Sequence, residues 1–155
     1  MASFIISRPI PEHFRSHLQE AIETLGYYRM DALDQLLAMY RDQWPRGLSS
    51  SMFRIADIQP HLSEKGLADP YHAQKATHLR AIFNLNREEF DDKQPEWSQF
   101  ASRVTFWARG QWLCEEARQR DQTELLASER WHLPLAECGQ EWCPCHWTWT
   151  MDLLS

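Results

Sequence analysis

The sequence is short of glycine, and its five glycines all stand alone. Neither a G-x-G-x-x-G fingerprint nor a G-K-S/T phosphate loop is present, which excludes nucleotide binding by either motif. No apolar run approaches the roughly 20 residues that a helix needs to cross a bilayer. The first apolar burst, residues 4–6, has no basic flank before it. We therefore expect no secretory signal, no membrane partner and a soluble, cytoplasmic protein with reduced cysteines.

The sequence also lacks concentrated positive charge. Its formal net charge is −6, and residues 132–155 contain no Lys or Arg. A broad phosphate-binding face is therefore not supported. Paired-carboxylate motifs and the order of a catalytic triad are missing as well. An enzyme is thus the least supported class, and no residue is assigned a catalytic role.

Helical periodicity dominates the chain as far as residue 131. Apolar side chains recur three or four residues apart, and proline, serine or aspartate stands where several of these segments begin. We predict helices over residues 11–25, 33–44, 70–85 and 94–120, shorter helical pieces over 51–64 and 121–131, and a polar connector over 84–92.

The tail changes to the periodicity of a strand. Trp147 and Trp149 alternate with threonines, and Leu133 and Leu135 alternate in the same way. Strand formers on both sides of a turn-rich segment favour a hairpin. We predict a small β-hairpin, rich in Trp and Cys, within residues 132–155.

These patterns together predict the fold class. At 155 residues the chain is long enough for one compact domain and short for two. We expect a mainly α fold, with a single domain over residues 1–155. It would be a helical bundle of five or six helices with a small C-terminal β-hairpin, which residues 4–7 would join as an edge.

Three of the four cysteines lie in the tail and suggest a metal site. Cys138-x4-Cys143 has the usual spacing of a zinc knuckle, and Cys145 follows two residues later. With His146 and His132 these cysteines offer up to five ligands. A tetrahedral site needs four, so one structural zinc is a candidate cofactor.

Core packing is the alternative interpretation of the cysteines. Cys143 and Cys145 share the parity of the tail tryptophans, and free Cys is among the most buried residue types. The paired Cys-x2-Cys units of a strong zinc signature are missing. Cys145 beside His146 is a weak candidate nucleophile, because catalytic partners are neighbours in space rather than in sequence. Cys114 lies on the apolar stripe of the predicted long helix, where packing explains it.

The predicted helix 70–85 offers a second candidate site. His72, Lys75, His78 and Arg80 lie off its buried stripe and could address a groove of DNA. The turn before this helix is longer than that of a helix-turn-helix, and residues 48–90 carry as many acidic as basic side chains, five of each. A plain packed helix pair is the alternative interpretation.

The surplus of tryptophan favours protein binding. Eight tryptophans exceed what a core of this size readily buries, and Trp is enriched in interface hot spots. The leading hypothesis is a small regulatory or accessory protein that docks on a partner protein with a basic surface and could carry one zinc. A DNA-binding transcriptional regulator and an uncharacterised metal-dependent enzyme are the alternatives. The residues predicted to contact the protein partner are Trp142, Trp147, Trp149, Glu137 and Glu141.

Overall fold

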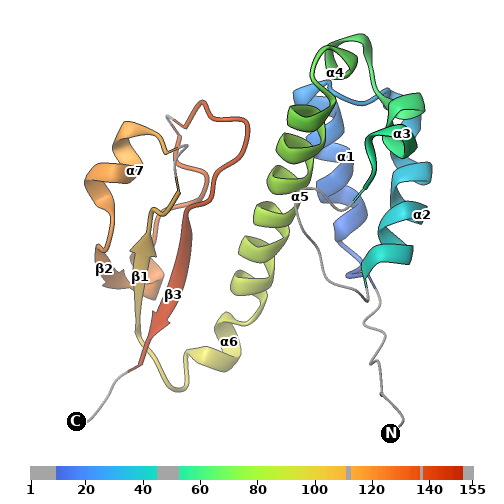
Figure 1. The fold of residues 1–155 in the computed structure, drawn as a ribbon. Coiled ribbons are helices and arrows are strands. Elements are labelled where there is room, and N and C mark those ends of the chain that lie inside the picture. The colour runs from blue at the N-terminus through green and yellow to red at the C-terminus, as the bar shows by residue number, and fades with distance from the viewer. Residues whose placement is uncertain (1–9, 45–52, 111–112, 137, 152–155) are drawn as a thin grey trace, which may run out of the picture. The chain divides into compact units, whose positions relative to one another are not determined.

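The computed structural model describes residues 10–44, 53–110, 113–136 and 138–151 (Figure 1). These residues are mainly helical and include a small antiparallel sheet, which confirms the predicted mainly α class. No helix among them is long and apolar enough to span a membrane.

The chain divides into two compact units, residues 1–82 (unit 1) and 83–155 (unit 2). The expectation of a single domain over the whole chain stays a prediction.

Unit 1 consists of helices and short turns. Its first two α-helices match the predicted segments closely, because each carries its own apolar stripe and a residue that ends it. Phe14, Leu18 and Ile22 of the first helix are buried, and Gly26 ends that helix in the left-handed conformation, at φ 71°. The elements are α1 (Phe14–Leu25), η1 (Met30–Ala32), α2 (Leu33–Gln43), α3 (Ile55–Ile58), η3 (Gln59–His61), α4 (Glu64–Ala68) and the first part of α5 (Pro70–Asp92).

The start of α4 closes the C-terminal end of α1. The Ser63 hydroxyl caps α4 by accepting from the Gly66 N–H, at 3.2 Å, and donates to the Gly26 carbonyl. Lys65 Nζ donates to the Leu25 carbonyl at 2.7 Å, which satisfies a carbonyl in the last turn of α1. A Cβ added at Gly66 would lie 2.0 Å from the Tyr27 carbonyl oxygen. Only glycine fits this contact between two backbones.

We predict that Gly66→Ala destabilises the protein. Alanine normally favours a helix over glycine by up to about 1 kcal/mol. Here its Cβ must displace a backbone carbonyl, so the free energy of unfolding should fall by about 3 kcal/mol. Urea denaturation followed by circular dichroism measures the change. Gly139→Ala is the control, because nothing lies within 4 Å of its added Cβ. A Gly66→Ala protein as stable as the wild type would contradict the packing described.

The fifth α-helix is longer than predicted. It begins after Asp69, whose carboxylate accepts from the His72 N–H at 3.2 Å, and it continues to Asp92. The predicted connector over residues 84–92 is therefore wrong. Its polar side chains are mostly good helix formers, and Leu85 is buried among them. The connector was predicted because polar side chains in this segment were taken as a sign of a loop.

The predicted helix over residues 94–120 is also wrong. The structure has three elements there: α6 (Gln94–Trp97), β1 (Arg103–Trp107) and α7 (Glu115–Arg120). Val104 and Phe106 are fully buried, while the residues between and beside them are not. This alternation, carried by β-branched and aromatic residues, is the pattern of a half-buried strand.

Strands also replace the last predicted helical piece, and the tail contributes one strand to a three-stranded sheet. The segment predicted helical over 121–131 contains β2 (Glu124–Leu126) and a short 3₁₀ turn, η4 (Ala127–Glu129). The tail strand is β3 (His146–Thr150), as its alternation predicts. It pairs with β1 rather than with residues 133–135, giving the antiparallel order β2-β1-β3. The predicted edge at residues 4–7 lies outside the described residues.

Candidate functional site

Unit 2 contains a pocket of about 640 Å³. This volume lies within the range of sites that bind small ligands or anchor side chains. Its walls come from the last turns of α5, the segment 127–133 and the start of β3. The aromatic side chains that line it are Phe83, Phe90, Trp131 and Trp147.

The aromatic wall is held by ring contacts. The ring of Trp131 meets Phe106 edge to face, with centroids 5.2 Å apart, and lies 5.4 Å from Trp147. Phe90 stacks on Trp149 at 5.0 Å. Contacts of this kind fix ring orientation, so the wall is largely preformed.

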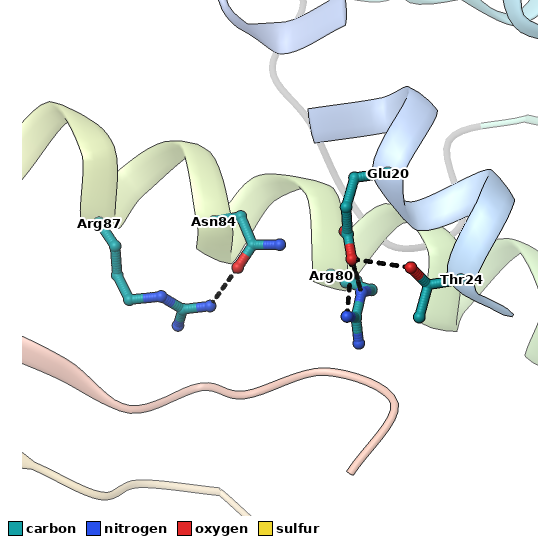
Figure 2. A network of polar contacts seen from close by, with 5 residues as sticks. All are labelled: Glu20, Thr24, Arg80, Asn84 and Arg87. Carbon is teal, nitrogen blue, oxygen red and sulfur yellow. Dashed lines mark hydrogen bonds and ion pairs between the residues drawn. The ribbon is translucent and has the colours of Figure 1, made fainter. Parts of the chain in front are cut away.

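Two arginines supply the polar part of the pocket. Arg87 Nη1 donates to the carbonyl oxygens of Cys143 and Cys145, at 2.7 and 3.2 Å. Figure 2 shows the other arm of the guanidinium on the side-chain oxygen of Asn84, one turn earlier in α5. The Arg130 guanidinium donates a hydrogen bond to the Asp91 carboxylate at 2.9 Å. Charge-assisted bonds to fixed acceptors hold both guanidinium groups in place.

All four cysteines of the chain meet in unit 2 as free thiols. The Cys143 thiol shares hydrogen bonds with Cys145 and with Cys138. Cys138 is also hydrogen-bonded to Cys114, the residue that precedes α7. Cys143 and Cys145 are buried in the core of the unit, and the other two pack against that core. The sequence prediction treated Cys114 as a packing residue of a long helix and so missed its contact with Cys138. The sequence has only four cysteines, and this low count was the only signal that all four lie close together.

Hydrogen bonding within the cluster separates the pKa values of its thiols. The bond from Cys145, together with the charge of Arg87, lowers the pKa of Cys143 to about 6. The same bond raises the pKa of Cys145 above its usual range. Burial raises the pKa of Cys138 to about 11. Cys143 is therefore the sulfur that carries negative charge most readily, and its two neighbours hold their protons.

The two histidines predicted as metal ligands lie at the surface. His146 is exposed, and its Nδ1 lies 3.2 Å from the Pro144 carbonyl oxygen. His132 is exposed at the rim of the pocket. Among the described residues, no group of three or more His, Cys, Asp or Glu side chains is placed so that it could hold a metal ion. The metal prediction is not tested by this finding.

Most of the residues predicted to contact a protein partner are buried or half-buried within unit 2. Trp142 and Trp147 are each only 7 % exposed, and Trp149 is half-buried against Phe90. Their burial argues against a role as exposed anchors, although Trp147 reaches the pocket wall. Glu141 is half-buried, and Glu137 lies outside the described residues.

The residues predicted to read DNA are divided between different environments. His78 is buried and shares a hydrogen bond of 2.9 Å with the Tyr40 hydroxyl. Arg80 pairs with Glu20 of α1 at 2.7 Å (Figure 2). His72 packs edge to face on Tyr27, and Lys75 is exposed. Three of the four side chains thus make packing contacts within unit 1, and the DNA interface stays a prediction.

Comparison with models of protein families, with characterised proteins and with solved structures finds no match for this chain. The function must therefore be argued from the site.

The buried His78 leads to a prediction about pH. Burial lowers the pKa of His78 from 6.5 to about 4. The unfolded chain therefore binds more protons between these two values, so the free energy of unfolding falls as the pH drops through this window. This residue alone should contribute a loss of about 2 kcal/mol between pH 7.5 and pH 5. Urea titrations of the wild type and of His78→Gln, which cannot titrate, measure it. Equal losses in both proteins would show that His78 is not held neutral.

Proposed function

We propose that the protein acts by binding another protein, and that the pocket of unit 2 takes an anchor side chain of that partner. The supporting observation is a preformed cavity of about 640 Å³ with four aromatic side chains in its wall. Binding energy in interfaces concentrates where a large side chain fills such a desolvated pocket. The exposed anchor inferred from the tryptophans is thereby replaced by a receptor site built from them.

The charge of the lining indicates which partner segment fits. Among the described residues, two guanidinium groups, Arg87 and Arg130, and a single carboxylate, Asp91, line the pocket. The histidines at the rim, His132 and His146, add donors. An aromatic or large aliphatic anchor next to a carboxylate matches this lining better than a basic segment does. The partner with a basic surface was inferred from acidic tail residues, of which Glu141 is described and does not line the pocket.

The pocket resembles a binding site for a side chain more than it resembles a thiol-dependent active site. Cys145 is the cysteine in its lining, and its hydrogen bond to Cys143 raises its pKa. A protonated, buried thiol is a poor nucleophile. Binding therefore has stronger support than catalysis by this residue.

An indole placed at the entrance of the pocket should weaken binding. Ser128 is exposed and lines the pocket, so Ser128→Trp places an indole at its entrance. Peptides selected on the wild type from a random display library should bind this variant at least about 30-fold more weakly, corresponding to about 2 kcal/mol. Fluorescence anisotropy with the selected peptides measures the affinity.

Gln119→Trp is the matched control, because Gln119 is an exposed residue of α7 that does not line the pocket. It should bind the peptides as the wild type does. The selected peptides should share an aromatic or large aliphatic residue beside Asp or Glu. Peptides that bind Ser128→Trp as tightly as the wild type, or a selection that enriches none, would refute the proposed function.

A further inference from the structure

Strand β3 forms one edge of the sheet in unit 2 (Figure 1). It has five residues, whereas β2, the strand at the other edge, has three. None of the five is Lys, Arg, Asp, Glu or Pro. Natural edge strands often carry a charge or a proline, because these features prevent pairing with another chain. The sequence of β3 lacks this protection.

The backbone of Trp147 points to this open edge. On the side of β1 that faces β2, the Phe106 N–H donates to the Thr123 carbonyl at 2.8 Å, and the Phe106 carbonyl accepts from the Gln122 N–H at 2.7 Å. Phe106 lies opposite Trp147 in the pairing of β1 with β3. Facing residues of an antiparallel pair alternate between bonded and non-bonded, so Phe106 and Trp147 are a non-bonded pair. The N–H and C=O of Trp147 therefore point away from β1.

Arg87 occupies the same edge directly before β3. By the alternation just described, the carbonyl of Cys145 leaves the chain on the same side as that of Trp147. This carbonyl is one of the two that accept from Arg87, at 3.2 Å. No described residue forms a comparable bond with the outward N–H or C=O of Trp147. The fold thus supplies a hydrogen-bond partner at Cys145 and leaves the edge open at Trp147.

The open part of the edge lies beside the pocket. His146 and Trp147, the first two residues of β3, both line it. Side chains that lie opposite each other on paired strands leave the sheet on the same face. A residue paired with Trp147 would therefore place its side chain on the face where the Trp147 ring meets Phe106 and Trp131. That face carries the aromatic wall of the pocket, so the pocket can receive this side chain.

We propose that the partner segment binds in an extended conformation and adds a fourth strand to the sheet at β3. This inference rests on the proposed function, because the anchor that fills the pocket is the residue opposite Trp147. The segment exchanges main-chain hydrogen bonds with Trp147. A carboxylate of the segment pairs with Arg87 or Arg130, the two guanidinium groups of the lining. In strand addition, main-chain bonds supply affinity, and pockets for side chains supply specificity.

An extended segment fits this edge better than a helix does. A helix bonds its own backbone groups internally, so it has no main-chain donor or acceptor to offer Trp147. A helix seated on the pocket would also shield the N–H and C=O of Trp147 from water without replacing their hydrogen bonds. Backbone groups buried in this way are rare in native structures because they are costly. The open edge therefore favours a segment that supplies backbone groups of its own.

Methylation of backbone amides in the selected peptides tests the proposal. The probes are the peptides that the full-length wild type enriches from the random display library, each synthesised with one amide methylated at a time. A methylated amide cannot donate, and in an added strand only every second N–H faces β3. Methylation of these amides should weaken binding at least about tenfold. The amides between them face away from β3 and are the matched control, and their methylation should change the affinity less than about threefold.

Hydrogen exchange locates the added strand on the protein. Saturating peptide should slow exchange of the Trp147 amide at least about tenfold, because its N–H gains an acceptor. The amides of β2, on the opposite edge of the sheet, are the control and should exchange as they do without peptide. A Trp147 amide that the peptide does not slow would contradict pairing at this edge.

The outcomes separate this inference from the proposed function. Equal losses at consecutive amides, or no loss at any amide, would overturn the added strand. The proposed function would still stand in either case if Ser128→Trp weakens binding of the same peptides. A selection that enriches no peptide refutes the proposed function, and the inference about β3 falls with it.

Discussion

The hydrogen bonds from Arg87 to the carbonyl oxygens of Cys143 and Cys145 connect the features that matter in unit 2. They attach the last turns of α5 to residues 143–145, which carry two of the four thiols and lead into β3. The same guanidinium lines the pocket. Bonds from a charged donor are roughly twice as strong as neutral ones, and a carbonyl left without its donor is costly when buried. The position of the pocket wall and the position of the cysteines therefore depend on one side chain.

This arrangement places the pocket and two of the cysteines on a shared piece of backbone. Cys145 is hydrogen-bonded to Cys143 and also lines the pocket, and the next residues of β3 continue the pocket wall. A single Trp at the start of β3, Trp147, then packs on the core through Phe106 and faces the pocket. Structural support and ligand recognition are thus assigned to neighbouring residues of one strand.

Sequence reasoning succeeded where a segment carries its own boundaries and failed where distant segments decide the structure. The helix over residues 14–25 has a buried stripe and Gly26 behind it, so local information was sufficient. Residues 103–107 also fit a helical spacing, but antiparallel pairing with β3 makes them a strand, and no local signal reports that partner. The tail cysteines were identified as a candidate site, whereas Cys114 joins them only through the fold. The pocket has no sequence motif, because its aromatic residues come from three separate segments.

Hydrogen exchange on a pair of variants from the same helix tests the role of Arg87 most directly. Arg87→Leu removes the donor to the two carbonyls, whereas Arg80→Leu removes the partner of Glu20 in unit 1 (Figure 2). Loss of the Arg87 bonds should speed exchange of the amides in residues 138–147 about tenfold or more, with α1 unchanged. Arg80→Leu should affect α1 and leave residues 138–147 as in the wild type. If Arg87→Leu left exchange in residues 138–147 unchanged, the positions of residues 143–145 and of the pocket wall would not depend on this arginine.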